Sequence, residues 1–346
     1  MSTKCNNDKS SCNFFFDALG DLTYSQEDYD AVVILINKVI NKEKPAFVIH
    51  IGDTQPSPRG LSRPGITWLP IALNEEQFIA KRNLWWTIKS PFFITPGDND
   101  WTDTIEAPSP NIIMPWTPPY PPNPDPISTL EAFRTVFYRQ GMNKQPRFQV
   151  CTQRNFIENK RWIYRDVIFM TVHTVSGNNG LNPNNSPFPE ARQAIIDESQ
   201  IRINANLDWI NRAFDLAEEL QLRGLVIATQ AAFDFFNPSS GFSAMIKLIR
   251  DRTLYNYNLK NSMQVLFIYG DAHEFKVSKP LPISGTYPPL EVLRPDANAL
   301  PNFTAICVPG AAYKENTFIG FPGRVKISVD FNSQGLFSVY TSLNTL

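Results

Sequence analysis

The stretch Phe92-Phe93-Ile94-Thr95-Pro96-Gly97-Asp98, residues 92–98, is a short apolar run that ends in a Gly-Asp dipeptide. Three other apolar runs end in the same way, with Leu19-Gly20-Asp21, Ile51-Gly52-Asp53 and Tyr269-Gly270-Asp271. A glycine permits a sharp turn, and the residue after it is then presented at the carboxyl end of a strand, where open α/β sheets bind ligands. One Gly-Asp is an ordinary turn signal. Four of them, each closing a buried strand, predict four carboxylates at one edge of the sheet.

Apolar runs of this kind alternate with helical patterns, and this alternation predicts a layered α/β fold. The runs expected to be buried strands cover residues 13–20, 46–52, 91–97, 167–174, 224–230 and 265–270. Apolar residues three or four apart predict four helices, which include residues 29–40, 75–89, 133–137 and 207–217. Ser25 and Asn74 are the expected caps of the first two, and Ser128 with Glu131 is the expected capping box of the third. The C-terminal runs at 303–308, 324–331 and 336–342 have no helix between them and are expected to be antiparallel strands.

The composition limits the class of protein. The chain has 346 residues, 42% apolar and 19% charged, which is enough for a sizeable core in a single domain over 1–346. Its 32 basic and 33 acidic residues give a net charge of −1, which argues against general nucleic-acid binding. No apolar run approaches the ~20 residues of a membrane span, and no signal peptide is visible. The compartment stays open, with secretion as one alternative if the chain is a mature form, and the oligomeric state is not predicted.

Two residue counts stand out, 29 Pro and 3 His. The prolines concentrate in two loops, 55–70 and 107–127, which we interpret as lids over the site, with surface decoration as the alternative. Residues 1–12 form a short polar tail, in which Cys5 and Cys12 either close a short loop or stay free thiols. The scarcity of histidine excludes a metal site rich in imidazole.

Four neighbouring carboxylates repel one another unless they bind cations or protons. We therefore expect two divalent metal ions, because such a pair, bridged by a carboxylate, assists displacement at phosphorus. The alternative is that each aspartate caps the helix that follows it. Asn99 and Asp100 offer further oxygen ligands after Asp98, and Gln230 stands where the 224–229 strand runs out.

The three histidines have different expected roles. His273 follows Asp271 by two residues, so in an extended segment both side chains point the same way, and we expect His273 to be a ligand. His50 lies inside a predicted strand and is expected to be a core histidine. His173 ends the 167–172 strand, and its expected role is either contact with the metal ligands or the substrate, or structural hydrogen bonding.

In their order along the chain, these blocks resemble the calcineurin-like metallophosphoesterases. The resemblance spans roughly residues 14–280 and includes Gly97-Asp98-Asn99-Asp100-Trp101, which is similar to the Gly-Asp-Asn-Glu-Trp block of a divergent branch. It also includes the stretch His-Thr-Val-Ser-Gly-Asn-Asn at 173–179. The resemblance implies a four-layer α/β/β/α sandwich, in which two mixed sheets pack face to face with flanking helices.

The sequence departs from the family pattern at several metal-binding histidines. Thr23, Gln230 and Asp271 stand where the family has ligand histidines, and Asn99 stands where it has the proton-donating one. The resemblance then implies that one metal is held by Asp21, Asp53 and His273. The other is held by Asp53, Asp98 (or Asn99 in another register), Gln230 and Asp271. Such an oxygen-rich set favours Mn²⁺ or Mg²⁺, with Fe or Zn as alternatives.

The predicted activity is hydrolysis of a phosphate mono- or diester on a small phosphorylated substrate, by attack of a metal-activated hydroxide. The expected catalytic residues are Asn99, Asp100 and His173, and the expected substrate-binding residues are Asn178, Arg59 and Arg63. Trp101, Trp116 and Tyr120 are candidates for an aromatic wall beside a base or sugar. The alternatives are a family member that has lost catalysis and acts as a binding or effector module, and a carbohydrate hydrolase with paired carboxylates.

Overall fold

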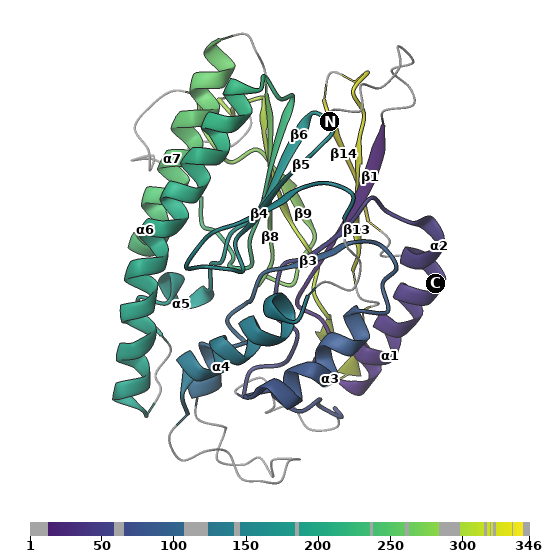
Figure 1. Cartoon of the computed structure of the whole chain (residues 1–346), viewed down its shortest axis with the longest axis vertical. Helices are drawn as coiled ribbons and strands as arrows, with labels where there is room; N and C mark the ends of the chain where they lie inside the picture. Colours follow the sequence, from purple (N-terminus) through teal and green to yellow (C-terminus); the bar gives the residue numbers. More distant parts are fainter. Residues whose placement is uncertain are drawn as a thin grey trace.

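Two large mixed β-sheets form the centre of the protein (Figure 1). The computed structural model describes residues 13–58, 66–106, 124–141, 146–183, 187–235, 238–259, 263–283, 298–314, 317–318, 320, 323–333 and 335–341. The first sheet has the strand order β14-β13-β1-β2-β3. Its strands are β1 (Phe14–Leu19), β2 (Val48–His50), β3 (Phe92–Ile94), β13 (Val325–Val329) and β14 (Phe337–Thr341). In this sheet β1, β2 and β3 are parallel, and the pairings of β13 with β1 and with β14 are antiparallel.

The second sheet has the order β4-β5-β6-β7-β8-β10-β9. Its strands are β4 (Val150–Thr152), β5 (Lys160–Tyr164), β6 (Val167–Thr171), β7 (Gly224–Ala228), β8 (Gln264–Tyr269), β9 (Lys276–Ser278) and β10 (Phe303–Cys307). The neighbours β6, β7, β8 and β10 are parallel. A separate antiparallel pair is formed by β11 (Tyr313–Lys314) and β12 (Thr317–Phe318).

The inner faces of the two sheets pack against each other through one apolar core. Phe16 and Ile49 from the first sheet and Phe169 from the second are fully buried in it. Phe93 of β3 stacks on Trp162 of β5, with 3.8 Å between ring centroids. Both faces of each central strand are therefore covered, which explains why the strand sequences are almost continuously apolar.

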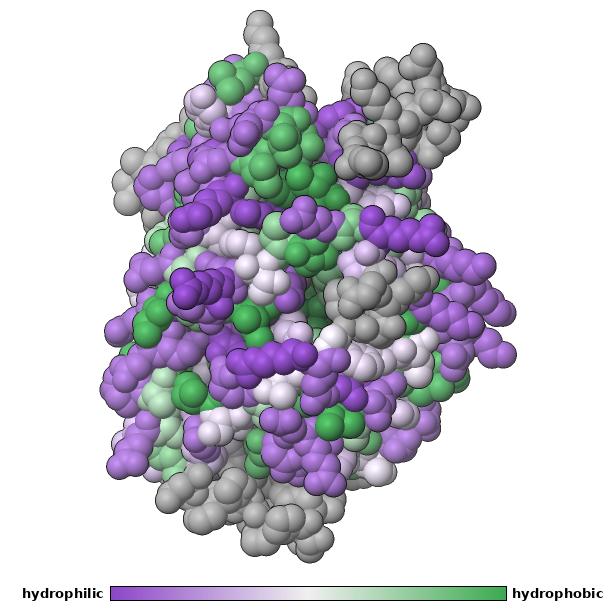
Figure 2. Space-filling model, viewed as in Figure 1, coloured by the Kyte–Doolittle hydropathy of each residue, from purple (hydrophilic) through white to green (hydrophobic). Residues whose placement is uncertain are grey.

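Helices cover the outer face of each sheet. Against the first sheet lie α1 (Gln26–Leu35), the π-helical turn η2 (Ile36–Ile40), α2 (Asn41–Glu43), α3 (Glu75–Trp85), α4 (Pro126–Arg134) and the turn η5 (Thr135–Arg139). Against the second lie α6 (Pro189–Glu219) and α7 (Ser240–Asn258). Hydrophilic residues predominate on the face seen in Figure 2, as expected for helices that bury one side. The four layers confirm the predicted α/β/β/α sandwich.

The C-terminal strands and the start of α4 agree only in part with the predictions made from the sequence. The antiparallel pairing of β13 and β14 is confirmed. The prediction for β10 is wrong in part, because this strand pairs antiparallel with β9 but parallel with β8. The chain forms β9 at the edge of the sheet, and β10 then inserts between β8 and β9. An apolar pattern does not encode this direction. The predicted capping box at Ser128 is also wrong, since α4 starts earlier and the carboxylate of Asp125 accepts the backbone N–H of Ser128 at 3.0 Å.

The predicted caps at Ser25 and Asn74 are confirmed. The Ser25 hydroxyl accepts the backbone N–H of Asp28 at 3.3 Å, and the Asn74 side chain accepts that of Gln77 at 3.1 Å. Most of the loop 107–127, part of the loop 55–70 and the tail with Cys5 and Cys12 lie outside the described residues. Among the helices in the described ranges, none combines the length and the apolar character needed to cross a bilayer.

Candidate metal centre

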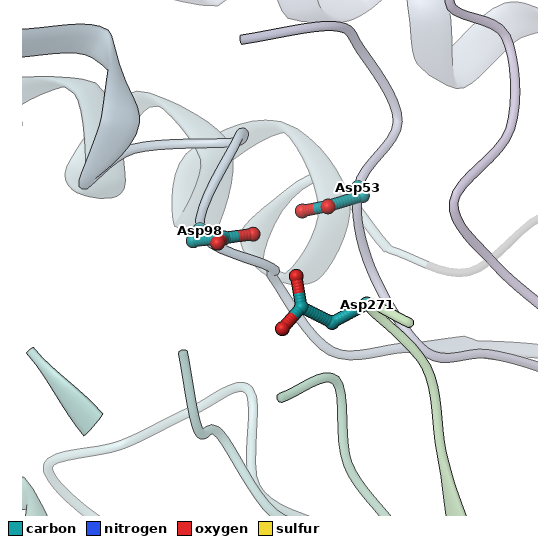
Figure 3. A group of neighbouring side chains, drawn as sticks. All are labelled: Asp53, Asp98 and Asp271. Atoms are coloured by element: carbon teal, nitrogen blue, oxygen red, sulfur yellow. The ribbon is translucent and has the colours of Figure 1, made fainter. Parts of the chain in front are cut away.

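Four strands deliver an aspartate to the same end of the sandwich. Asp21, Asp53 and Asp98 follow β1, β2 and β3, and Asp271 follows β8 of the second sheet. The carboxylates of Asp53, Asp98 and Asp271 point toward one another from three separate segments (Figure 3), and ligand atoms of the three lie within 4.8 Å of one another. The backbone N–H of Asp271 donates to both carboxylate oxygens of Asp21, at 3.1 Å each. All four acids therefore meet where the two sheets end.

The glycine of the Gly-Asp pairs makes this approach possible. A Cβ on Gly97 would lie 2.0 Å from Oδ1 of Asp53, and a Cβ on Gly270 would lie 2.4 Å from Oδ2 of Asp21. These glycines therefore leave room for a carboxylate from the neighbouring strand end. The left-handed backbone conformation falls on the acids themselves, with φ of 54° at Asp21, 57° at Asp53 and 65° for the residue after Gly270. Aspartate tolerates this conformation better than most residues with a side chain.

Gln230 bridges two of the acids. Its Nε2 donates to Oδ2 of Asp53 at 3.2 Å and to Oδ1 of Asp98 at 2.9 Å. The side chain is fully buried, and its Oε1 has no hydrogen-bond partner among the described residues. Half a turn about the Cγ–Cδ bond exchanges the oxygen and the nitrogen, so the same side chain can offer an oxygen to a cation. Carboxylate and amide oxygens at this spacing fit a hard divalent ion.

Tyr24 also belongs to the centre, and sequence reasoning missed it. Its hydroxyl donates to Oδ2 of Asp53 at 3.1 Å and accepts from Nδ2 of Asn99 at 3.1 Å. The backbone N–H of Asn99 donates to Oδ1 of Asp53, at 3.1 Å. The signal in the sequence was the position of Tyr24, three residues after Asp21 and next to Thr23, which stands at the family's histidine position.

His273 lies beside Asp21 with one ring nitrogen available. Nδ1 is 3.0 Å from the carbonyl oxygen of Ala311, which only accepts, so Nδ1 carries the proton. Nε2 lies 3.9 Å from Oδ1 of Asp21, and the side chain is 34% exposed. The lone pair of Nε2 is therefore free for a ligand.

The cluster concentrates negative charge in a buried place. Burial and then the negative charges of neighbouring carboxylates raise the pKa of Asp53, and burial raises the pKa of Asp21 and of Asp271. Among the described residues, no lysine or arginine forms an ion pair with any of the four acids. A divalent cation would compensate this charge, which is a second reason why the residues fit a metal site.

Two expected catalytic residues have structural roles instead. The carboxylate of Asp100 is fully buried and accepts the backbone N–H groups of Asp53 at 2.9 Å, Gly97 at 2.9 Å and Thr54 at 3.0 Å. It braces the strand ends and offers no oxygen to the cluster. His173 is fully buried, and both of its ring nitrogens have partners inside the protein, so the expected contact with a substrate is corrected to structural hydrogen bonding.

The remaining expected residues lie as follows. Trp101 is fully buried, so its place in an aromatic wall is wrong. His50 is buried and its Nδ1 accepts the backbone N–H of Gly52 at 3.1 Å, which confirms a core histidine. Asn178 is half-buried and its side chain bonds to the start of α7, at Ser240 and Gly241. Arg59, Arg63, Trp116 and Tyr120 lie outside the described residues.

Asn178 belongs to a tight left-handed turn beside the acids. Within and just after α5 (Ser176–Asn179), φ is 63° at Gly177, 59° at Asn178, 59° at Asn179 and 82° at Gly180. The hydroxyl of Ser176 donates to Oδ2 of Asp98 at the start of the turn. The turn is therefore joined directly to the acid cluster.

Among the solved structures to which this chain is similar are the following two. No protein family matches the sequence, and no curated protein matches it. One solved structure is GAP50, the anchor in the inner membrane complex of Plasmodium, with a TM-score of 0.48 and 12% identity, covering 95% of this chain and 84% of that chain. The other is PhoD, with a TM-score of 0.47 and 15% identity, covering 95% of this chain and 68% of that chain. At this level of similarity, neither structure indicates an activity for this chain.

Proposed function

We propose that this protein is a metal-dependent phosphoesterase of the calcineurin-like type, which hydrolyses a phosphate mono- or diester. The observation that carries the proposal is the convergence of Asp53, Asp98 and Asp271, with ligand atoms within 4.8 Å of one another at the ends of two sheets. The buried Oε1 of Gln230, which has no partner in the described part of the chain, supports it.

Two groups of residues would hold the cations. Asp21, Asp53 and the free Nε2 of His273 would hold one, and Asp53, Asp98, Gln230 and Asp271 the other, with Asn99 as an alternative ligand. Bound divalent ions would polarise a phosphoryl oxygen, activate water as a nucleophile and neutralise negative charge developing on the phosphate. Mn²⁺ and Mg²⁺ suit this oxygen-rich set better than Zn²⁺.

The chain's own groups would orient the substrate. The side-chain amide of Asn99, held by the hydroxyl of Tyr24, would donate a hydrogen bond near the leaving group. An amide does not release a proton at neutral pH, so protonation of the leaving group would be weaker than with a histidine at this position. Asn178 and the loop residues Arg59 and Arg63 remain candidates for binding phosphate.

The test is metal content and turnover, measured together. The purified protein is analysed for Mn, Fe, Zn and Mg and assayed with p-nitrophenyl phosphate and bis-p-nitrophenyl phosphate in the presence of each ion. Asp53→Asn is expected to abolish turnover. Asp208→Asn is the matched control, because Asp208 is exposed on α6 and pairs only with Arg212 among the described residues. Equal turnover in the two variants would contradict the proposal.

A binding or effector module is the second candidate. The observation that favours it is that Asn99, an amide, occupies the position of the family's proton donor, while Asp100 and His173 are occupied by structural hydrogen bonds. Absence of bound metal and of turnover, in the wild type and in Asp53→Asn alike, would favour this candidate over the enzyme.

A further inference from the structure

A chain of buried hydrogen bonds lies behind the acid cluster, outside the proposed chemistry. Nε1 of Trp101 donates to Nε2 of His173 at 3.1 Å, and Nδ1 of the same imidazole lies 2.8 Å from Oε1 of Glu158. Glu158 in turn forms a bidentate ion pair with Arg134, which donates from Nη2 to Oε1 at 2.6 Å and from Nε to Oε2 at 2.9 Å. Trp101, Glu158 and His173 are fully buried.

The proton positions along this chain follow from its ends. An indole N–H only donates, so Nε2 of His173 accepts, and the ring proton sits on Nδ1 and is donated to Glu158. Burial lowers the pKa of His173, which keeps the imidazole neutral. Burial alone would raise the pKa of Glu158, but the bond from His173 and the charge of Arg134 lower it to about 2. The orientation of the imidazole ring is thus determined on both sides.

The Trp101 end of this chain of hydrogen bonds fixes the backbone turn that carries Asp98. The backbone N–H of Trp101 donates to the carbonyl oxygen of Asp98 at 3.1 Å, and that of Asp103 donates to the same oxygen at 2.9 Å. The indole ring cannot rotate without breaking its bond to His173. The direction in which Asp98 leaves the turn therefore depends on that bond.

The other end reaches the carboxylate of Asp98 through the backbone. The carbonyl oxygen of His173 accepts from Nη1 of Arg202 at 3.2 Å and from Nδ2 of Asn206 at 2.7 Å, both on α6. Three residues further on, the hydroxyl of Ser176 donates to Oδ2 of Asp98. His173 is thus linked to Asp98 in two ways. Its ring holds Trp101 in the turn that carries Asp98, and its backbone leads to Ser176, whose hydroxyl is bound to Asp98.

We propose that His173, Trp101 and Glu158 are positioning residues, which hold the carboxylate of Asp98 in the orientation that binds a divalent cation. The inference rests on the proposed function, because it assigns these residues to the same cation site. They touch neither the cation nor the substrate. Removal of a residue that orients a metal ligand commonly changes the affinity for the metal by about 10–100-fold.

The experiment compares two tryptophan variants. Trp101→Phe keeps an aromatic ring and deletes only the indole N–H that binds His173. Trp85→Phe is the matched control, since Trp85 is equally buried, beside His50, and its indole N–H has no hydrogen-bond partner among the described residues. Titration calorimetry with Mn²⁺ is expected to show about tenfold weaker binding for Trp101→Phe and unchanged binding for Trp85→Phe. Equal affinities in wild type and Trp101→Phe would overturn the inference.

A second readout separates this inference from the proposed function. Hydrogen exchange of the backbone amides of Asn99 and Trp101, measured without metal, is expected to be faster in Trp101→Phe than in the control. If the wild type binds no Mn²⁺, the proposed function fails, and unchanged exchange would then also overturn the positioning role. A third measurement uses the wild type alone and so does not depend on the folding of a variant. The imidazole ¹⁵N signals of His173 are expected to show the Nδ1–H tautomer. An Nε2–H tautomer would contradict the hydrogen-bond chain.

Discussion

The backbone N–H of Asp271 donates to both carboxylate oxygens of Asp21, at 3.1 Å each, although 250 residues separate the two. Asp21 follows β1 of one sheet, and Asp271 follows β8 of the other. An acid from the first sheet is therefore oriented by the main chain of the second. The candidate metal centre can form only after the two sheets have packed together.

Gly97→Ala tests how closely the strand ends approach each other. Its Cβ would lie 2.0 Å from Oδ1 of Asp53, so we expect a loss of about 1–3 kcal/mol in the free energy of unfolding, together with weaker Mn²⁺ binding. Gly335→Ala is the control, because a Cβ there meets no atom within 4 Å. Urea unfolding and calorimetry measure the two effects, and equal stability of the two variants would contradict the close contact.

Tyr24→Phe tests the residue that the sequence motifs did not reveal. The change removes the hydroxyl between Asp53 and Asn99 and keeps the ring. We expect Mn²⁺ affinity to fall by about tenfold or more, because the carboxylate loses a group that orients it. Tyr255→Phe, at a residue that is 53% exposed on α7, is expected to bind Mn²⁺ like the wild type. An unchanged affinity in Tyr24→Phe would show that the hydroxyl does not orient Asp53.

Arg202→Met tests the anchor of the left-handed turn. The Arg202 side chain is fully buried, and Nη1 donates to Oδ1 of Asn179 at 2.6 Å while Nε donates to Glu198 at 2.9 Å. Removing the guanidinium group of Arg202 leaves buried acceptors unpaired, so we expect a loss of about 3–5 kcal/mol in the free energy of unfolding. Arg212→Met removes an exposed pair with Asp208 and should cost less than about 1 kcal/mol. Comparable losses in the two variants, measured by urea unfolding, would argue against the anchor.

Acid sensitivity follows from Glu158 and His173. The bond from His173 and the charge of Arg134 outweigh burial and lower the pKa of Glu158 from 4.5 to about 2, and burial lowers the pKa of His173 from 6.5. Both groups bind fewer protons in the folded than in the unfolded state. The contribution of these two groups to the free energy of unfolding should therefore fall as the pH decreases, first below about 6.5 through His173 and then between 4.5 and about 2 through Glu158. The carboxylates with a raised pKa, such as Asp21 and Asp271, act in the opposite direction, so the comparison of variant and wild type isolates the contribution of Glu158.

Urea unfolding between about pH 7 and pH 3 measures this dependence. Glu158→Gln is expected to remove the loss of stability that the wild type shows below about pH 4.5 through this group, because the amide does not titrate. Glu219→Gln, at an exposed position of α6, should leave the profile unchanged. A profile for Glu158→Gln parallel to the wild type would show that another group carries the acid dependence.

The sequence was most informative where a pattern is local. An apolar run closed by Gly-Asp depends on neighbouring residues only, and it located β1, β2, β3 and β8 together with the aspartates that follow them. The direction of β10 depends on where β9 lies, and no local pattern records this.

The roles of Asp100 and His173 could not be inferred, because their partners come from distant segments. Asp100 accepts backbone N–H groups from residues 53 and 54, and His173 bonds to Trp101 and Glu158. Both have the chemistry expected of a catalytic group, and only tertiary packing shows that the hydrogen-bonding atoms of the two side chains already bind other parts of the protein. Tyr24 is the opposite case, since an ordinary core tyrosine and a tyrosine at a metal centre look alike in a sequence.

The turn from Gly177 to Gly180 limits which residues this part of the chain can contain. Four successive residues have a positive φ, the left-handed region of the backbone, and the residues there are Gly, Asn, Asn and Gly. Glycine adopts it readily, and asparagine and aspartate do so at less cost than most other residues. A library randomised at these four positions and selected for folding should therefore return mainly glycine, asparagine and aspartate. Handedness of the main chain, before any requirement of chemistry, would set the limits of variation beside the candidate metal centre.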